Sequence, residues 1–534
     1  MNKSLQNIKD SFIEKNEEKD VSLGSETTEA TVLSSPTIYS EEEKEKDQPD
    51  EVEVKDGLNT YKNIIKGSSF FGGVQIFNIL ITLIRGKFVA IILGPEGMGI
   101  TALFNSASNT IQRFASLGLN QSIVRDVAED NVSQQKENVI KASLRITNIT
   151  AFLGLLICVA FCIPLSRLTF GDTSYWWQFM MLGAGVFFAI AGTGKLSILQ
   201  GLHEVKRISK ASVVGGLAGL GIGIPLYYIF GYYGIVPAIV VIFLVLYIFY
   251  SFSLHRSYSY QYPSETWRKY IPIIKKLLSL GIVLMAGDLI ATLVGYLINL
   301  YIRIFGGVDD VGLYQAANSV TNQYTGVIFA ALAMDYFPRL SKVAGDNDKM
   351  NQAVNRQSEV VAWLITPALV ALILSTPLVI RVLLSESFHS IVPLMRWMGL
   401  GMMLRAFSFP MAYITFAKGN KKVFFIMEGL VCNALTLVIS CLFFRWFGLI
   451  GLGYALVVDN ALCFIIYYVV NNRLYNYNFS YASSLNFIGG AVLTGACFVF
   501  SFFHSVALSY SLMGVVCIIS LVWSFFALKT HFKA

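Results

Sequence analysis

The stretch LITLIRGKFVAII, Leu80–Ile92, places an arginine and a lysine inside an otherwise apolar run. A charge at the centre of a bilayer costs about 2.5–3.5 kcal/mol on insertion scales, so charged residues in membrane segments are rare and usually face a cavity or a partner. Arg85 and Lys87 therefore either line a polar cavity or extend their charged ends to the outer headgroups. The apolar continuation Phe88–Leu93 favours the cavity.

The composition of the whole chain indicates a membrane protein with many spans. Its 534 residues are 54% hydrophobic and 14% charged, whereas soluble proteins are about 25% charged. The mean hydropathy is +0.58. Long apolar runs predict an all-α polytopic protein with about fourteen transmembrane helices. The predicted spans are 66–93, 98–121, 143–166, 176–199, 210–230, 234–254, 277–303, 312–337, 358–383, 392–416, 423–444, 448–470, 485–503 and 509–528.

The distribution of lysine and arginine predicts the orientation. Loops that follow the even-numbered spans hold most of these cations, whereas loops after odd-numbered spans are short and carry few besides Arg167 and Arg445. Cytoplasmic loops are the ones enriched in lysine and arginine. We therefore expect both termini to be cytoplasmic.

The first sixty residues differ from the rest of the chain. They hold 16 acidic and 7 basic residues, a net charge of −9 in a chain of +7, so the remainder carries +16. Low apolar content and high charge predict a disordered cytoplasmic tail. It has no signal-peptide core, so we do not expect a cleaved targeting segment. The alternative to a solvated extension is a regulatory or partner-binding arm.

Three pairs of short motifs indicate an internal repeat. Gly94 and Gly99, followed by Asn105, Ser106 and Asn109, recur 213 positions later as Gly307, Gly312, Asn318, Ser319 and Asn322. The motifs FGYYGIVPA and FGLIGLGYA lie 217 positions apart, and Gly201 and Val205 recur after 218 as Gly419 and Val423. An even number of spans per repeat predicts two six-helix bundles of the same orientation, related by a pseudo-two-fold axis along the membrane normal.

This repeat sets the predicted domain organisation. The parts are an acidic tail (1–60), an N-terminal six-helix bundle (61–256), a cytoplasmic linker (257–276), a C-terminal six-helix bundle (277–473), and two extra helices with a C-terminal tail (474–534). In transporters with parallel repeats, the substrate is handled where the repeats meet.

Charged residues within the spans carry the functional signal. Arg85, Lys87 and Arg113 lie in the first two spans, and buried cations need an anionic partner. Arginine suits phosphate and pyrophosphate in particular, because it can donate two parallel hydrogen bonds. The sequence therefore predicts a cationic cavity that binds a phosphorylated ligand.

Acids and amides give two further sets of candidates. Asp288 and Asp335 in spans 7 and 8 either pair with cavity cations or take up and release a coupling ion, H⁺ or Na⁺. The amides of the repeat either hydrogen-bond sugar hydroxyls or hold helices together. These amides are Asn105, Asn109, Asn318 and Asn322, with Gln323 beside them.

Several kinds of site are not predicted. All seven cysteines lie in the spans and are interpreted as small core residues, and the five histidines show no metal-ligand spacing. We predict no catalytic residue, no metal, no cofactor and no nucleic-acid partner.

The segment LGPEGMGITALFNSASNTIQRFASLGLNQSIVRDVAE, Leu93–Glu129, with the preceding Arg-Gly-Lys, resembles the bacterial O-antigen flippases, or polysaccharide translocases. These share a superfamily with the multidrug-and-toxin exporters and the lipid II flippases. The resemblance covers about 65–475. It implies a V-shaped, two-bundle transporter of the inner membrane that alternates its access and uses an ion gradient.

The implied substrate is undecaprenyl-pyrophosphate-linked oligosaccharide, moved from the cytoplasmic to the periplasmic leaflet, with membrane lipids and other polysaccharide-assembly proteins as partners. Family members commonly line their cavity with cations, and Arg85, Lys87 and Arg113 stand where that pattern expects charge. The long acidic tail and the last two spans depart from the pattern, since many relatives have twelve spans.

Two other functions remain as alternatives. A multidrug or cation antiporter of the same superfamily would favour an acidic, aromatic cavity, which the +16 charge outside the tail disfavours. A membrane glycosyltransferase or polymerase would need a large periplasmic loop with catalytic acids or arginine, and the predicted outer loops are short.

Overall fold

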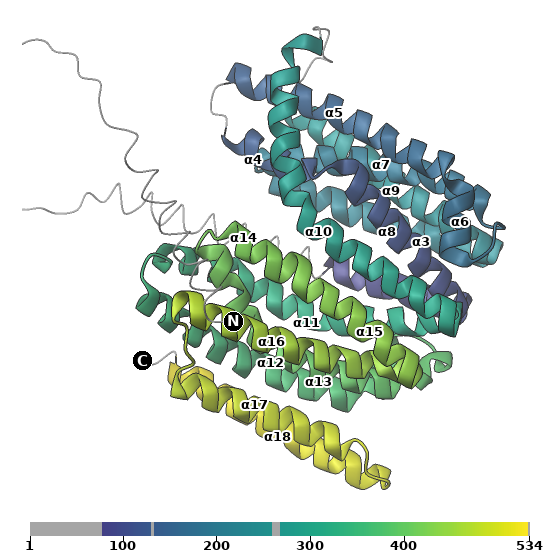
Figure 1. The fold of residues 1–534 in the computed structure, drawn as a ribbon. Coiled ribbons are helices and arrows are strands. Elements are labelled where there is room, and N and C mark those ends of the chain that lie inside the picture. The colour runs from purple at the N-terminus through teal and green to yellow at the C-terminus, as the bar shows by residue number, and fades with distance from the viewer. Residues whose placement is uncertain (1–76, 130–132, 259–266, 532–534) are drawn as a thin grey trace, which may run out of the picture. The chain divides into compact units, whose positions relative to one another are not determined.

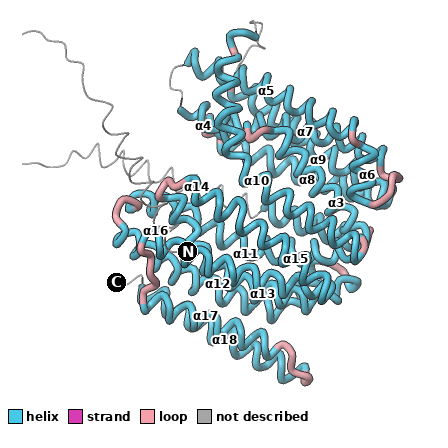
Figure 2. Tube along the Cα trace, in the orientation of Figure 1, coloured by secondary structure: helices cyan, strands magenta, loops and turns pink. Residues whose placement is uncertain are grey.

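The computed structural model describes residues 77–129, 133–258 and 267–531. The predicted acidic tail therefore lies outside the described residues, as do residues 259–266 of the predicted linker 257–276. Within the described ranges the chain is helical and contains no strand, and short loops join consecutive helices (Figure 2). The predicted all-α fold class is confirmed.

The first half of the described chain (Figure 1) begins with a helix over 77–92. It continues with α3 (Gly94–Ser116), α4 (Leu119–Glu129), α5 (Ser133–Ala160), α6 (Cys162–Phe170), α7 (Trp176–Gly201), α8 (Val205–Phe230) and α9 (Ile235–Ser257).

The second half begins with the longest helices of the fold. Its helices are α10 (Ile271–Gly306), α11 (Val308–Val343), α12 (Asn347–Leu383), α13 (Val392–Ala417), α14 (Lys421–Phe424), a π-helix (Phe425–Cys432), α15 (Asn433–Phe447), α16 (Gly451–Tyr475), α17 (Tyr481–Phe500) and α18 (Val506–His531).

Each predicted span overlaps one of these helices or consecutive ones, although residues 66–76 of the first span lie outside the described residues. Nine helical stretches in the described ranges are long and apolar enough to cross a membrane, and two of these, of 53 and 55 residues, contain two predicted spans each. Neither α3 nor α11 is among the nine, because polar side chains interrupt their apolar surface. The protein is a multi-pass membrane protein, and the number of fourteen spans stays a prediction.

Two pairs of the repeated glycines have positive φ angles in both halves. Gly94, the first residue of α3, has φ of +65°, and Gly307, directly before α11, has φ of +95°. Gly231 and Gly448 have φ of +55° and +62° and each begins a short 3₁₀ turn. Only glycine adopts such angles without steric cost. The repeat read from the sequence is therefore a repeat of helix boundaries.

Helices α3 and α11 meet through a reciprocal glycine contact formed by Pro95, Gly99, Val308 and Gly312. A Cβ atom added to Gly99 would lie 2.0 Å from the carbonyl oxygen of Val308, and one added to Gly312 would lie 1.9 Å from that of Pro95. Each residue of one contact is 213 positions from its counterpart in the other. The N-terminal ends of the two helices therefore touch backbone to backbone.

Helix α10 runs beside helices of the first half over its whole length. Near its start, Lys276 forms an ion pair with Asp126 of α4 at 3.3 Å, and a Cβ atom on Gly118 would lie 2.0 Å from the carbonyl oxygen of Gly281. Near its end, Arg303 donates to the carbonyl oxygen of Leu168 at 3.1 Å. The opposite face of α10 packs on α11, the π-helix and α15, so α10 contacts helices of both halves.

The two C-terminal helices cover one side of the second half. α17 packs on α12 and α13, and α18 packs on α12 and α17. An indole hydrogen bond from Trp363 to Asn486 (3.0 Å) and one from Arg396 to the carbonyl oxygen of Ser501 (3.0 Å) hold α17 and the turn after it in place. The remaining face of α18 exposes apolar side chains such as Phe525 and Phe526, as a lipid-facing helix does.

Candidate functional site

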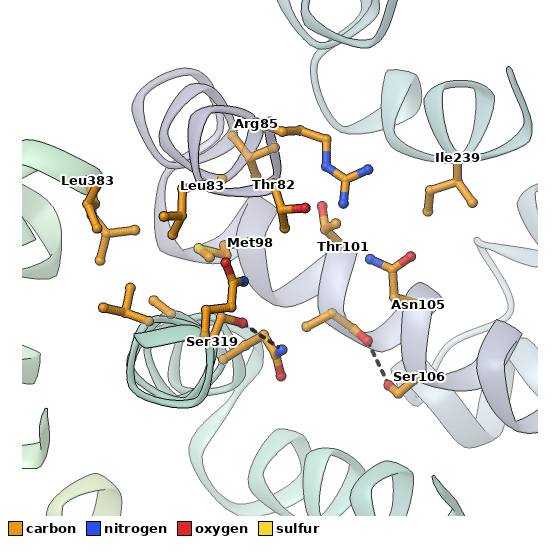
Figure 3. A pocket seen from close by; sticks show the side chains of 18 of the residues that line it. Thr82, Leu83, Arg85, Met98, Thr101, Asn105, Ser106, Ile239, Ser319 and Leu383 are labelled. Atoms are coloured by element: carbon orange, nitrogen blue, oxygen red, sulfur yellow. Dashed lines mark hydrogen bonds between the residues drawn. The ribbon is translucent and has the colours of Figure 1, made fainter. Parts of the chain in front are cut away.

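A polar cavity of about 280 Å³ lies where the first helix, α3, α10 and α11 come together (Figure 3). Its apolar wall includes Val89, Met98, Leu383 and Leu384. The reciprocal glycine contact joins two of these helices at their N-terminal ends, close in sequence to Met98. The cavity therefore lies between the halves that the repeat predicts to enclose a substrate.

The charge of the cavity comes from Arg85. Its half-buried side chain is the one charged group among the described residues that line the cavity, and no aspartate or glutamate lies among them. Figure 3 shows its guanidinium directed to the same space as the side chains of Thr101 and Asn105. Within the described part of the chain, Arg85 forms no hydrogen bond or ion pair. An arginine in this setting favours an anionic ligand.

Hydroxyl and amide groups form the rest of the polar wall. They follow a four-residue spacing on both helices, which places them on one face of each. The lining side chains are Thr101, Asn105 and Asn109 of α3, and Gln315, Ser319 and Gln323 of α11. From α10, Asn299 donates to the hydroxyl oxygen of Ser106 at 3.3 Å. Such a surface can exchange hydrogen bonds with many hydroxyl groups at once.

Two of the predicted site residues bind each other. Arg113, in the last turn of α3, forms an ion pair with Asp288 of α10 at 3.3 Å, and both side chains are about half exposed, at 50% and 48%. Gln121 donates to the same carboxylate oxygen at 3.4 Å. Neither Arg113 nor Asp288 lines the cavity. The sequence left two roles for Asp288, pairing with a cation or uptake of a coupling ion. In this structure Asp288 pairs with a cation, Arg113.

The other predicted residues lie apart from the cavity. Lys87 is half-buried on the first helix and does not line it. Asn322 donates to Asn318 at 2.6 Å and accepts a bond from Arg405 at 3.4 Å, so these amides face α13. Asp335 belongs to α11, but its side chain is outside the described residues. The roles predicted for these residues stay predictions.

A second polar cluster lies in the second half. The Tyr467 hydroxyl of α16 donates to Glu428 of the π-helix, and Thr436 donates to the buried Asp459 at 2.8 Å. The sequence shows both acids as charges within spans but gives them no role. Their hydrogen-bond partners include neutral hydroxyl groups, and the positive charge of Arg405 acts on both carboxylates, so this cluster contains both acids and a cation.

Acidic groups also lie at the ends of α3 and α11 beside the reciprocal glycine contact. Tyr232 donates to Glu96 at 3.0 Å. Asp310 precedes the predicted span 312–337, and burial together with the neighbouring Asp309 raises the pKa of its carboxyl. These acids do not line the cavity, so they do not offset the positive charge that Arg85 contributes to it.

The sequence missed Asn299, the cavity residue contributed by α10. It is one amide in the apolar segment LINLYIRIF, and a single amide is a weaker signal of a polar surface than a charge. On α11 the repeat pointed to Asn318, Ser319 and Asn322, of which Ser319 lines the cavity and the two asparagines do not. Gln323, also named from the sequence, and Gln315 complete that face. A repeat gives equivalent positions, but the partners of each helix decide which face lines a cavity.

Comparison with known proteins shows the family of this chain. A family model described as polysaccharide biosynthesis protein matches residues 88–393. The lipid III flippase of Escherichia coli (strain K12) is 23% identical over 375 residues, which cover 68% of this chain and 88% of that protein.

Two solved structures share the fold. The lipid II flippase MurJ in an inward closed conformation has a TM-score of 0.66 at 13% identity, covering 88% of this chain and 100% of MurJ. An inward-facing multidrug resistance MATE family transporter of the MOP superfamily has a TM-score of 0.64 at 19% identity, covering 75% of this chain and 94% of that one.

These matches agree with the resemblance read from the first two spans. The predicted resemblance to polysaccharide translocases is confirmed by the family model of polysaccharide biosynthesis proteins, and the relatives named here are flippases or transporters rather than enzymes. The family match covers more than half of the chain and includes α3, α10 and α11, from which most of the polar cavity wall comes. The chain belongs to the polysaccharide biosynthesis protein family.

Proposed function

We propose that this protein moves an undecaprenyl-pyrophosphate-linked oligosaccharide from the cytoplasmic to the periplasmic leaflet of a bacterial inner membrane. It does so by alternating access between the two halves, driven by an ion gradient. The lipid III flippase and the lipid II flippase among its relatives support a lipid-linked substrate. In this proposal both termini are cytoplasmic, and other polysaccharide-assembly proteins supply and receive the substrate.

The observation that carries the proposal is the composition of the cavity. Arg85 supplies one positive charge among hydroxyl and amide groups, with no carboxylate in the described lining. A pyrophosphate joined to a sugar presents this combination of chemistry, an anion beside a set of hydroxyls. Since stripping water from sugar hydroxyls is costly in hydrocarbon, a wall of hydrogen-bonding groups is what such a head group needs while its prenyl tail stays in lipid.

The same lining argues against the alternative functions. An exporter of cationic drugs needs an anionic or aromatic cavity, and the charge in this one is an arginine. A glycosyltransferase or polymerase needs a catalytic acid or base beside its substrate, and the described lining contains no aspartate, glutamate or histidine.

The test compares two cations on the same helix. Replacing Arg85 with alanine should lower transport of the lipid-linked oligosaccharide by roughly 10- to 100-fold, the effect expected when a charged hydrogen bond is lost. Lys87→Ala is the matched control, because Lys87 is two residues away and outside the lining. Transport is measured as surface polysaccharide in cells, with the amount of protein in the membrane determined in parallel.

The two variants give distinct outcomes. Normal polysaccharide from a stably expressed Arg85→Ala protein would contradict the assignment of the phosphate site. Equal losses in both variants would indicate that total charge on the first helix matters more than the cavity.

Ion coupling is a separate part of the proposal. Asp288 and Asp335 are its candidates, with H⁺ or Na⁺ as the coupling ion. A carboxylate at membrane depth favours the uptake of a cation because it is poorly solvated. Asp288 can serve this role only if its ion pair with Arg113 opens during the cycle.

A further inference from the structure

Two amide oxygens in the cavity wall have no hydrogen-bond partner. The Asn299 side chain of α10 is 6% exposed, and its Oδ1 is buried without a partner in the described part of the chain. The Oε1 of Gln323 on α11 is likewise buried without a hydrogen-bond partner in the described residues. Both residues line the polar cavity. A buried acceptor left unpaired costs free energy, so a donor from a ligand that reaches either oxygen would restore a missing hydrogen bond.

The orientation of the Asn299 amide follows from its neighbour. The Ser106 hydroxyl donates to the carbonyl oxygen of Ala102 at 2.6 Å, so its oxygen is left to accept. Asn299 can therefore direct only its NH₂ group to Ser106, the bond drawn as a dashed line at Ser106 in Figure 3. The network thus fixes Oδ1 as the free atom of the amide.

The two free oxygens and Arg85 select different parts of a ligand. Arg85 is a cation on the first helix, whereas Asn299 and Gln323 are neutral acceptors on α10 and α11. The amide oxygens accept hydrogen bonds from O–H and N–H groups and repel carboxylate oxygens. With Arg85 bound to phosphate, the described lining holds no second cation to neutralise an acidic sugar.

We propose that Asn299 and Gln323 accept hydrogen bonds from the hydroxyl and amide hydrogens of an uncharged sugar next to the pyrophosphate, and so exclude sugar acids from this position. This inference rests on the proposed function, because it names the sugar that the same cavity admits. It assigns phosphate recognition to one helix and sugar recognition to two others.

The experiment measures binding of three lipids to the purified full-length protein in nanodiscs. The probes are undecaprenyl pyrophosphate alone, the same lipid carrying an N-acetylhexosamine, and the same lipid carrying a hexuronic acid. The wild-type protein should bind the neutral-sugar lipid more tightly than the bare lipid and discriminate against the uronic acid. Asn299→Leu and Gln323→Leu should each lower the affinity for the neutral-sugar lipid by roughly tenfold, the effect of one lost hydrogen bond. Neither variant should change the affinity for the bare lipid.

The control variants separate this inference from the function on which it rests. Arg85→Ala should weaken the binding of all three lipids, whereas Gln112→Leu, which replaces an amide of α3 outside the lining, should change none of them. Failure of the wild-type protein to bind any of the lipids would overturn the proposed function. Tight binding of the neutral-sugar lipid by both leucine variants, with Arg85→Ala still defective, would overturn only the sugar assignment.

A gain-of-function variant keeps the test independent of folding. Gln323→Arg adds a cation to the wall and should raise binding of the uronic-acid lipid above the wild-type level. An unchanged or lower affinity for that lipid in a variant that still binds the bare lipid would contradict the selection by charge.

Discussion

Arg85 and Lys87 are neighbouring charges in one membrane segment, but only one of the two side chains lines the cavity. They are two residues apart, so they point to different sides of the helix. Arg85 faces the cavity, and Lys87 does not line it. The sequence alone treats them as one cationic pair, because the direction of a helix face is set by its neighbours.

The pair Arg113–Asp288 can be tested with a double variant. Asp288→Asn leaves Arg113 without its partner, and adding Arg113→Gln removes the unpaired charge. If the pair is only structural, both variants should keep most of the transport activity, since exposed ion pairs of this kind contribute only about 0–1 kcal/mol. If Asp288 couples an ion, both variants should lose transport.

The measurement is substrate transport in proteoliposomes with and without an imposed H⁺ or Na⁺ gradient. A double variant that stays inactive and no longer responds to either gradient would identify Asp288 as a coupling residue. Asp335→Asn serves as a second variant, and unchanged gradient dependence in both aspartate variants would remove the ion-coupling proposal.

Much of the candidate site could be predicted from the sequence, for a physical reason. Polar residues are costly in a membrane, so Arg85, Asn105 and Asn109 stand out against apolar neighbours, and all three line the cavity. Asn299 did not stand out, because its importance comes from α10 lying beside α3, a contact between positions 193 residues apart. Pairings of that kind depend on the packing of whole helices.

Helices α3 and α11 are the elements on which both the cavity and its closure depend. Their polar faces line the cavity, and their N-terminal ends meet in the reciprocal glycine contact. We propose that a ligand leaves on that side when these ends separate. The contact is therefore the part of the fold that we expect to open in the opposite conformation.

Glycine variants test this role of the contact. Gly99→Ala and Gly312→Ala place a Cβ atom about 2 Å from a carbonyl oxygen, which forces the helix ends apart at a cost of roughly 1–3 kcal/mol. We expect a lower melting temperature and faster thiol labelling of Asn105→Cys from the periplasmic side. Gly326→Ala is the control, since nothing lies within 4 Å of its added Cβ atom on the same helix.

The labelling requires a background in which the seven native cysteines are replaced. Labelling of Asn105→Cys at the same rate in all three glycine variants would contradict a gate at the reciprocal glycine contact. Equal loss of stability in the Gly326→Ala control would indicate a general effect of alanine in α11.

The membrane orientation predicted from the loops can be tested for the whole molecule. Loops with many cations should face the cytoplasm, so reporter groups fused after residue 534 and in the loop before α12 should be cytoplasmic. A reporter in the turn between α6 and α7 should be periplasmic. Protease or thiol accessibility in intact cells measures this, and a periplasmic C-terminus would require an odd number of spans.

At this scale the fold was the most predictable property of the chain. In a membrane each apolar run must satisfy its own backbone hydrogen bonds as a helix, so hydropathy alone located the helices. The division of the span 423–444 by a π-helix, and the contacts of α10 with both halves, were not predicted. Both depend on packing between helices, which composition does not describe.

The reciprocal glycine contact has a consequence for the origin of the chain. Each partner supplies both a glycine and a carbonyl oxygen, at positions related by the same offset. A surface that is complementary to itself in this way is the isologous interface of a two-fold dimer. A half-length ancestor with this one motif would already hold the complete contact when two copies met, and fusion of the duplicated genes would have preserved it without a new interface.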